Sequence, residues 1–545
     1  MESRRKQEFK KGVTADDGRR RRGETSVQLR KEKKEENLSK RRNLLPVNST
    51  ESPLENSGAI PQSQTPQIPQ DKDRKFTIND IPSLMSGLTS VDSSTQVSSL
   101  RGFRKLLSAE KKPPVQECID CGAVPLFVTY LQRNDNTELQ FEAAWALTNI
   151  ASTDLTRLVV DCGAVPFLSQ LLASPNPEVR EQCAWCLGNV AGDGAELRDI
   201  VLKNGALTHL LANIQQPANL SLLRNCTWTL SNFCRGKPQP PLSAVAPAIP
   251  VVAALLQSNC DEDTMIDAAW ALSYLSDGDN HRIQAVVESG VVHILVAMLS
   301  SARVQSVIPA LRTLGNIVSG DDHQTQMVVN ANVLPSLTIL LSHCKKNIRK
   351  ESCWMLSNIA AGNIDQVNLL VNTPDLVPKL LTQLSAGAEW DVRKEAAWVV
   401  SNIATGGSRV HVKCMVEYGV IRPLCDLLDV AEVRVLLVAM EAIECILKNA
   451  DNEEYTKLID EAEGIEKLEN LQEHEHLDVY EKAVHIIEEY FNGEDEVESE
   501  NLAPAATAAN QFSFGLSTQS TAVDFKGFNS NSAAIPQTAF SFGSL

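Results

Sequence analysis

Aromatic residues are scarce in this chain: Phe, Trp and Tyr make up only 5% of its 545 residues. Ala, Leu, Val and Ile dominate the middle of the sequence instead, and such a composition favours helices packed on helices over sheets. We therefore expect an all-α protein, which at this length holds either several domains or one repeat array with a continuous core.

Long apolar stretches are also missing. No run of 18 or more apolar residues is present, so the sequence predicts no helix that could span a bilayer. The N-terminus is charged rather than apolar, which excludes a secretory signal. We expect a soluble, intracellular protein.

Cysteine is present in 13 copies but without the companions that a metal site needs. Two pairs have CxxC spacing, Cys118/Cys121 and Cys183/Cys186, yet no further His or Cys lies at a zinc-binding distance along the sequence. Cys121 precedes a Gly as Cys162 does, so an ordinary repeat position explains it. We expect buried free thiols in a reducing compartment, with no metal and no cofactor.

The sequence also lacks the motifs of common catalytic sites. We find no phosphate-binding loop, no metal-ligand cluster and no nucleophile paired with a base in a recognisable context. We therefore predict that the protein is not an enzyme.

Charge is distributed unevenly along the chain. Residues 1–45 carry sixteen Lys and Arg against eight Asp and Glu, a net charge of +8, whereas the whole chain carries −17, which leaves −25 for residues 46–545. An acidic body repels the phosphates of nucleic acids and favours cationic peptides. The basic arm could itself be such a ligand.

A motif recurs along the chain at nearly constant spacing. AAWALTNIAS (143–152) is followed by CAWCLGNVAG, CTWTLSNFCR, AAWALSYLSD, ALRTLGNIVS, SCWMLSNIAA and AAWVVSNIAT. Counted at the Trp position, the copies stand at residues 145, 185, 228, 270, 312, 354 and 398. Weaker copies place Phe103, Glu441 and Val484 at further steps of 42 or 43 residues, so we count ten repeats.

A second shared element, as in CGAVPLFVTYL (121–131), indicates a Gly break followed by a new amphipathic helix. Each repeat then consists of helix, Gly turn, helix, loop and helix, and this pattern at a period of 40 to 44 residues is typical of armadillo repeats. We predict a right-handed superhelical solenoid of about ten armadillo repeats over residues 76–492. A basic arm (1–45) and a flexible Pro/Ser/Gln-rich linker (46–75) precede it, and a disordered, first acidic tail (493–545) follows it.

Each strong copy of the motif pairs a Trp with an Asn one turn later, so both side chains point to the same face of the helix. We expect stacked repeats to align these pairs into two parallel rows on the concave surface. An Asn amide offers one donor and one acceptor to the main chain of an extended peptide, as Asn149, Asn189 and Asn232 could. Parallel Trp rings leave slots that suit the stems of Lys and Arg, while packing in the core is the competing role for these rings.

Acidic residues accompany the two rows. Asp267, Glu351 and Glu395 each lie three residues before the Trp of their own repeat. Asp193 follows the second Trp/Asn pair, and Asp322 follows Asn316. We expect these carboxylates to receive cationic heads, with helix capping and solvated helix surface as the alternatives.

The rows break in the middle of the array. Tyr274 replaces an Asn, and Arg312 replaces a Trp while Asn316 is retained. Two binding stretches result, one centred on Trp145, Trp185 and Trp228 and the other on Trp354 and Trp398, which a bipartite basic ligand could span.

Together these motifs resemble importin-α, the adaptor that carries nuclear localisation signals. Residues 4–42, with the RRRR run, VQLRK and a terminal KRR, are similar to its importin-β-binding domain. The resemblance implies importin-β contacts by Arg19, Arg20, Arg21, Arg22, Arg30 and Lys31. It also implies that Lys40, Arg41 and Arg42 occupy the body's own cargo site when importin-β is absent.

By the same resemblance, the signal would bind at two sites. The major site would comprise Trp145, Asn149, Gln182, Trp185, Asn189, Asp193, Trp228, Asn232 and Asp267. The minor site would comprise Trp270, Tyr274, Arg312, Asn316, Asp322, Glu351, Trp354, Asn358, Glu395, Trp398 and Asn402. The loop ASTDLT is about two residues shorter than the family's usual form, which puts contacts near Thr156 in doubt.

Two further partners follow from the resemblance. The last repeat, HEHLDVYEKAVHIIEEYF, is similar to the family's docking surface for the export receptor that recycles it, although plain solvation would explain its acidity equally. FSFG at 512–515 and 540–543 resembles nucleoporin repeats and could contact transport receptors or nucleoporins.

We therefore expect a nuclear import adaptor that shuttles between cytoplasm and nucleus, without membrane or direct nucleic-acid ligands. The alternative is an armadillo scaffold of the catenin type that binds other extended tails. The acidic residues of the rows argue against it, because acidic or phosphorylated tails would require a basic surface.

Overall fold

The computed structural model describes residues 76–108, 113–258, 260–450 and 454–491, together with two short strands at 505–507 and 511–513. The chain divides into two compact units, residues 1–484 and 485–545, and α31 crosses the boundary between them. Within the described residues, no helix is both long and apolar enough to cross a membrane.

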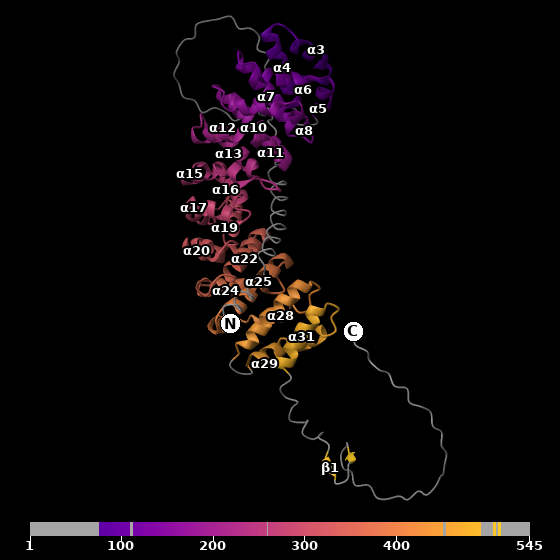
Figure 1. Cartoon of the computed structure of the whole chain (residues 1–545), viewed down its shortest axis with the longest axis vertical. Coiled ribbons are helices and arrows are strands. Elements are labelled where there is room, and N and C mark those ends of the chain that lie inside the picture. The colour runs from indigo at the N-terminus through magenta and orange to yellow at the C-terminus, as the bar shows by residue number, and fades with distance from the viewer. Residues whose placement is uncertain are drawn as a thin grey trace, which may run out of the picture. The chain divides into compact units, whose positions relative to one another are not determined.

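The described part of the chain contains nine three-helix repeats, which confirms the predicted all-α repeat array (Figure 1). A repeat with two α-helices, α3 (Ile81–Leu88) and α4 (Ser93–Leu107), precedes them and is itself preceded by the 3-10 turn η2 (Ile78–Asp80). The first helices of the nine repeats are α5 (Val115–Asp120), α8 (Thr156–Asp161), α11 (Ala195–Lys203), α14 (Leu242–Val245), α17 (Asn280–Glu288), α20 (Asp322–Asn330), α23 (Ile364–Val371), α26 (Arg409–Glu417) and α29 (Glu454–Glu461).

The second helices are α6 (Ala123–Leu131), α9 (Ala164–Leu171), α12 (Ala206–Gln215), α15 (Ala248–Gln257), α18 (Val292–Met298), α21 (Val333–Leu340), α24 (Leu376–Leu384), α27 (Ile421–Cys425) and α30 (Gly464–Leu471). The third helices are α7 (Thr137–Ala151), α10 (Pro177–Asp193), α13 (Leu220–Cys234), α16 (Glu262–Leu275), α19 (Val304–Ile317), α22 (Lys346–Ala360), α25 (Trp390–Gly406), α28 (Val433–Lys448) and α31 (Leu477–Tyr490).

The corner between the first and second helix of a repeat has left-handed backbone geometry. Gly122 and Gly163 each adopt φ 79°, a conformation that costs a glycine little because it has no Cβ. At the same corner, later repeats use Asn332, Asp375 and Glu463, with φ between 59° and 64°. The predicted break between the two helices is therefore confirmed, and the backbone geometry persists where the glycine is replaced.

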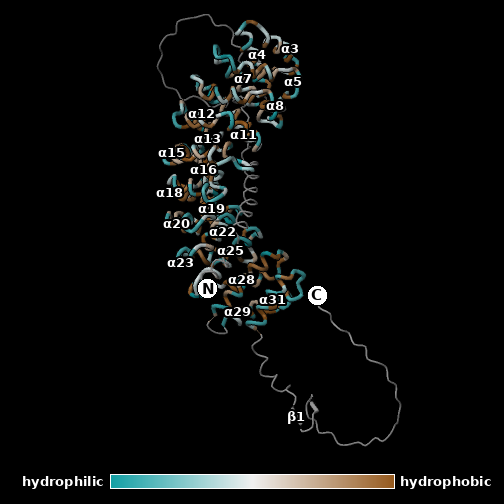
Figure 2. The backbone as a smooth tube through the Cα atoms, in the orientation of Figure 1, coloured by the Kyte–Doolittle hydropathy of each residue, from teal (hydrophilic) through white to brown (hydrophobic). Residues whose placement is uncertain are grey.

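The third helices pack in series, α7 on α10, α10 on α13, and so on to α25 on α28. Figure 1 shows α13, α16, α19, α22 and α25 following one another, with α15, α17 and α20 beside them at the left. The core lies between neighbouring repeats and includes fully buried residues such as Leu147 and Leu187. Apolar and hydrophilic residues alternate within the helices, as expected for helices that each bury one face (Figure 2).

Two strands lie in the segment for which the sequence predicts no regular structure. β1 (Ala505–Thr507) and β2 (Gln511–Ser513) pair antiparallel, with Ala506 opposite Phe512. Thr and Phe favour extended backbone, which accounts for strands in this otherwise Ala- and Asn-rich stretch. The rest of the predicted tail, the basic arm and the linker up to residue 75 lie outside the described residues.

Candidate peptide-binding surface

Six third helices carry the predicted Trp residues near the middle of their length. We call these six Trp residues and the Asn residues one turn after the Trp position the Trp/Asn row: Trp145, Asn149, Trp185, Asn189, Trp228, Asn232, Trp270, Asn316, Trp354, Asn358, Trp398 and Asn402. Because the third helices pack in series, the members of the row repeat from one helix to the next.

The rings of the row differ in exposure. Trp145 and Trp185 are half-buried, whereas Trp228 and Trp354 are only 2% exposed and Trp270 and Trp398 are also buried. Packing in the core, the competing role considered for these rings, therefore applies to Trp228, Trp270, Trp354 and Trp398. Trp145, Trp185, Trp228, Trp270 and Trp398 also have further partners in the chain beyond those given below.

The Asn side chains join neighbouring repeats. Nδ2 of Asn189 donates to the main-chain oxygen of Thr148 at 3.1 Å, and Nδ2 of Asn232 donates to that of Gly188 at 3.0 Å. In each case the acceptor is the residue just before the Asn of the preceding repeat. The amide therefore fixes the register between two third helices, a role that the sequence reasoning did not foresee.

The same bond recurs in the second stretch. Nδ2 of Asn316 donates to the Ser273 oxygen at 2.9 Å, and Nδ2 of Asn402 donates to the Ser357 oxygen at 2.9 Å. Asn358 is the exception, because its buried Nδ2 has no hydrogen-bond partner. An amide NH₂ carries two hydrogens and its oxygen two lone pairs, so the bond to the neighbouring repeat involves only one of the hydrogen-bonding positions of each side chain.

In two repeats a glycine before the Asn makes room for the next ring. A Cβ added at Gly188 would fall 2.4 Å from Cζ3 of Trp228, and one added at Gly315 would fall 2.3 Å from Cζ3 of Trp354. Real carbon atoms pack at about 3.5–4.0 Å, so the two rings rest directly on the glycine backbone. This contact explains why glycine precedes the Asn in these two repeats.

In the middle of the row, Tyr274 and Arg312 stand where other repeats have Asn and Trp, and both contact neighbouring side chains. The rings of Trp270 and Tyr274 stack with centroids 5.9 Å apart and planes inclined by 25°. Arg312, at the Trp position of its repeat, forms a buried ion pair with Glu351, its Nε lying 3.2 Å from Oε2. The break predicted from the sequence is thus a packed and paired segment of the row.

The candidate acidic residues fall into two groups. Asp267, Glu351 and Glu395 are buried on the third helices, and Gln182 is buried at the same position of α10. Asp193 is the last residue of α10 and is exposed. The helix dipole disfavours a negative charge at this end, so a contribution to helix stability does not explain why an acidic residue stands there. Asp322 is exposed in the first turn of α20, while the cap of that helix is Asp321; the capping role considered for Asp322 therefore belongs to its neighbour.

The Trp position of the repeat before the row was placed one residue too early from the sequence. Phe103 is fully buried and packs edge-on against Phe127 with centroids 5.4 Å apart. Arg104 instead lies over the ring of Trp145, with Cζ 4.2 Å from the centroid, and Asn149 Nδ2 donates to Oγ of Ser108 at 2.8 Å. Arg104 and Ser108 therefore hold the Trp and Asn positions of this repeat, one residue later than predicted.

Thr156, singled out for the shortened loop, is fully buried in the structure. Its hydroxyl donates to the main-chain oxygens of Ala151 at 3.0 Å and Thr153 at 2.8 Å, which ties the loop to the end of α7. In this chain the residue's described contacts are local and structural.

The CxxC cysteines are free thiols on helices or at helix ends. Burial raises the pKa of Cys118 and of Cys186 to about 12, so both thiols stay protonated at neutral pH. Within the part of the chain that the structure describes, no group of three or more His, Cys, Asp or Glu is placed to hold a metal ion.

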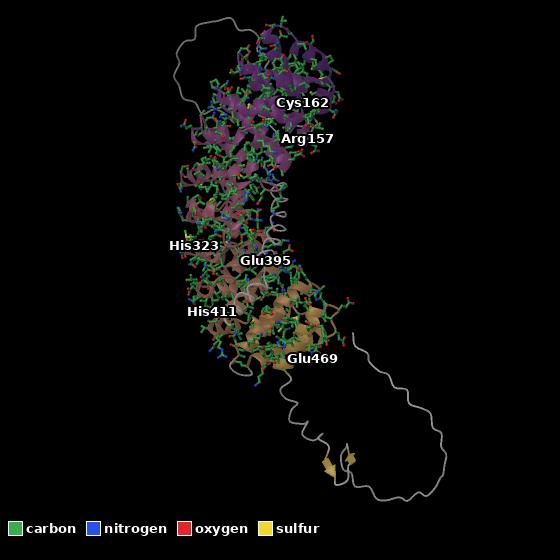
Figure 3. The ribbon with its side chains drawn as sticks, in the orientation of Figure 1. Arg157, Cys162, His323, Glu395, His411 and Glu469 are labelled. Atoms are coloured by element: carbon green, nitrogen blue, oxygen red, sulfur yellow. The ribbon has the colours of Figure 1, made fainter. Side chains whose placement is uncertain are left out.

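The remaining predicted residues, Lys40, Arg41, Arg42, Arg19, Arg20, Arg21, Arg22, Arg30 and Lys31, lie outside the described residues. Figure 3 places His323 and His411, both on first helices, along one edge of the first compact unit, and Glu395 away from that edge.

Comparison with known families covers both parts of the chain. The model of the importin-β-binding domain matches residues 5–101. The armadillo/β-catenin-like repeat matches residues 111–152, 152–192, 194–235, 279–319 and 321–361, and the atypical Arm repeat matches residues 453–505.

Relatives match over nearly the whole chain. The sequence is 47% identical to importin subunit alpha-2 of Arabidopsis thaliana, over 99% of this chain and 98% of the relative. It is 45% identical to importin subunit alpha-1b of Oryza sativa subsp. japonica, over 82% of this chain and 85% of that one. A crystal structure of an engineered protein superposes with a TM-score of 0.69 at 29% identity, over 75% of this chain and 98% of the other.

Proposed function

The chain belongs to the importin-α family of nuclear import adaptors, and we propose that its Trp/Asn row holds Lys/Arg-rich nuclear localisation signals as extended peptides. The observation that carries this proposal is the repeated Asn geometry. Each bonded Asn uses one N–H to fix its neighbour, so its amide is held in one orientation by a rigid helix pair. An amide held in this way can pair with a peptide main chain without reading its sequence.

Specificity for Lys and Arg comes from the rings and the acids. The face of an indole attracts a cation by about 0.5–2 kcal/mol, more where water is excluded, and accepts the aliphatic stem of a long side chain. Asp267 and Glu395 lie one turn before Trp270 and Trp398, and so share a helix face with those rings. A carboxylate beside an indole suits a cationic head above an aliphatic stem.

We infer two sites of unequal length from the break at Tyr274 and Arg312. The major site uses Trp145, Trp185 and Trp228, with Asn149, Asn189 and Asn232. The minor site uses Trp354 and Trp398, with Asn358 and Asn402, which suits a bipartite signal with two basic clusters.

The adaptor's other partner is importin-β, which the N-terminal arm binds, and we assign Arg19–Arg22, Arg30 and Lys31 to that contact. In the absence of importin-β, Lys40, Arg41 and Arg42 fold back on the row and inhibit cargo binding. The arm's net charge of +8 against −25 for the rest of the chain favours this exchange.

The same function implies movement between cytoplasm and nucleus and a non-enzymatic role. We assign the acidic last repeat to the export receptor that returns the adaptor. The FSFG motifs of the tail would bind transport receptors or nucleoporins, since Phe side chains suit hydrophobic pockets.

Calorimetry of a basic signal peptide tests the proposal. A chain that begins at residue 71 should bind the peptide more tightly than the full chain, because the competing arm is gone. Added salt should weaken both complexes. Equal affinity of the two chains would refute inhibition by the arm, and binding that resists both salt and the combined Trp185→Ala and Asn189→Ala changes would refute the row.

A catenin-type scaffold predicts the opposite preference. Such a chain would bind an acidic or phosphorylated peptide more tightly than a basic one in the same titration.

A further inference from the structure

Neighbouring repeats are joined at two seams. First helices pack on first helices, as α17 does on α20, and third helices pack on third helices, as α19 does on α22. We call these contacts the first-helix seam and the third-helix seam. Because they involve different helices, a joint between two repeats can be firmly bonded at one seam and loosely bonded at the other.

Gln324 of α20 fastens the first-helix seam between the fifth three-helix repeat (α17–α19) and the sixth (α20–α22). Its Nε2 donates to the main-chain oxygen of Asn280 and to Oε1 of Gln284, both on α17, at 3.1 Å each. Gln324 is only 2% exposed. Gln366 makes the same two kinds of bond one repeat later, at 2.9 and 3.0 Å. The first-helix seam of this joint is therefore bonded as its neighbour is.

The third-helix seams on either side of the α19–α22 contact are also well bonded. Asn316 and Ser306 of α19 each donate a hydrogen bond of 2.9 Å to α16. Asn402 of α25 donates to α22 at 2.9 Å, and Asp391 of α25 accepts from α22 at 3.0 Å. Each of these seams thus has an Asn bond and a second polar contact nearer the start of the third helices.

The seam between α13 and α16 shows what replaces a missing Asn bond. Tyr274 stands at the Asn position there, so the bond of the other repeats cannot form. Nε of Arg224 on α13 lies 2.8 Å from Oδ1 of Asp261, the N-cap of α16. This ion pair crosses the seam instead.

The third-helix seam between α19 and α22 has neither kind of bond at full strength. By its position, Nδ2 of Asn358 should reach the main-chain oxygen of Gly315, but it has no hydrogen-bond partner. Within the described residues, the hydrogen bonds and ion pairs between the two helices are those of Arg312 with Glu351, where Nη2 donates to Oε1 at 3.2 Å. Charged bonds of this type are commonly about 2.7–2.9 Å long, so this pair is stretched.

The helix on one side of this seam is itself weakened. Pro309 lies inside α19 and has no N–H, so the main-chain oxygen of Gln305 loses the bond that the residue four places later would supply. The proline ring also crowds that oxygen and favours a kink. Pro309 stands three residues before Arg312, at the position that an acid takes in α22 and α25. A helix-weakening residue and the loosely bonded seam therefore belong to the same joint.

We propose that the joint between the fifth and sixth repeats is a hinge, held at the first-helix seam by Gln324 and able to open at the third-helix seam between α19 and α22. Opening rotates the repeats up to α19 relative to those from α20 onward and changes the curvature of the array at one place. Domain hinges likewise concentrate the change in a few residues between rigid parts. A repeat array with such a joint can fit partners of different size that contact repeats on both sides of it, and this inference does not depend on what the Trp/Asn row binds.

Distances between spin labels test the hinge. Ala218, Ala302 and Ala386 are exposed, lie in the loops before α13, α19 and α25, and are spaced two repeats apart. A genetically encoded ketone amino acid at two of these positions takes a label that leaves the 13 native cysteines untouched. Labels at 218 and 302 span the seams α13–α16 and α16–α19, whereas labels at 302 and 386 span α19–α22 and α22–α25. Pulsed electron–electron double resonance on the full chain should give the second pair the broader distance distribution, extended toward longer distances.

Three variants show whether the named residues cause the difference. Pro309→Ala restores the missing N–H and should narrow the distribution for labels at 302 and 386. Asn316→Ala removes an Asn bond from a seam that has one and should broaden the distribution for labels at 218 and 302. Asn358→Ala is the matched control at the equivalent position of α22, and it should leave the distribution for 302 and 386 unchanged, because Nδ2 of Asn358 has no partner.

The inference is overturned if labels at 302 and 386 give a distribution no broader than that for labels at 218 and 302. It is also overturned if Pro309→Ala, folded as judged by circular dichroism, leaves the broader distribution as it is. If Pro309→Ala does not fold, the comparison of the two label pairs in the otherwise unchanged chain decides.

Discussion

Replacing Gly188 by Ala probes how the row is built. The added Cβ would lie 2.4 Å from Cζ3 of Trp228 and 2.6 Å from Oγ1 of Thr229. Trp228 is 2% exposed and packed, so the ring must move by about 1 Å or more to restore a normal carbon contact. Overpacking of this kind costs about 1–3 kcal/mol, against a gain of about 0.5–1 kcal/mol from replacing Gly inside a helix.

We therefore expect Gly188→Ala to lower the free energy of unfolding by up to about 2 kcal/mol and to weaken binding of a basic peptide at the major site. Denaturant unfolding and calorimetry measure the two effects. Gly387→Ala is the control, because a Cβ there meets nothing within 4 Å. A Gly188→Ala chain that is more stable than wild type, with unchanged peptide affinity, would refute the claim that the ring rests on the glycine.

Two further predictions concern the joints between repeats. Asn189→Ala should lower the free energy of unfolding by about 0.5–1.5 kcal/mol, because the bond to Thr148 is lost. Asn358→Ala should lower it by less, because Nδ2 of Asn358 has no hydrogen-bond partner. Equal losses in denaturant unfolding would contradict the claim that the Asn189 bond stabilises the contact between the two repeats. His411 accepts from the Ser408 main-chain N–H at Nδ1 and lies 3.2 Å from Oδ1 of Asn368 through Nε2, and burial lowers the pKa of its imidazole. Because the pKa of His411 is lower in the folded chain, the unfolded chain takes up the proton at a higher pH than the folded chain does. The contribution of the neutral imidazole to the free energy of unfolding should therefore be present above pH 6.5 and be lost as the pH falls below it. His411→Gln, which copies Gln324 and Gln366 at the same helix position, should melt with a smaller decrease in Tm between pH 7.5 and 5.5 than wild type, and identical decreases would exclude His411 as the cause.

The repeat architecture could be predicted because the sequence patterns that specify it lie within single repeats. The spacing of the Trp position, the Gly corner and the apolar periodicity each occur within one repeat, and the structure has three helices in each of nine repeats. The corner at Asn332 was less evident, since a polar residue there adopts φ 64° without the glycine signal.

What the sequence did not reveal depends on contacts between repeats. The acceptor of Asn189 is a main-chain oxygen about forty residues away, and every residue type offers such an oxygen. Likewise, Glu142 follows the same rule as Asp267 and Glu395, yet its pairing with Arg104 depends on a one-residue shift in the first repeat. The shift was missed because Phe103 imitates the expected aromatic residue while it packs on Phe127.

The burial of the later rings was also not predictable from the motif. Trp145 and Trp228 occupy equivalent positions, yet one is half-buried and the other 2% exposed. The difference depends on the surroundings of each ring, such as the glycine backbone under Trp228, and these surroundings form only when the repeats stack.

A crystal structure of the chain with a Lys/Arg-rich signal peptide tests the central claim most directly. The account predicts peptide main-chain groups within hydrogen-bonding distance of Asn149, Asn189 and Asn232, a lysine stem between neighbouring Trp rings, and the bonds from Asn189 to Thr148 and from Asn232 to Gly188 intact. A peptide bound on the first helices, or one that leaves these amides without a main-chain contact, would contradict it.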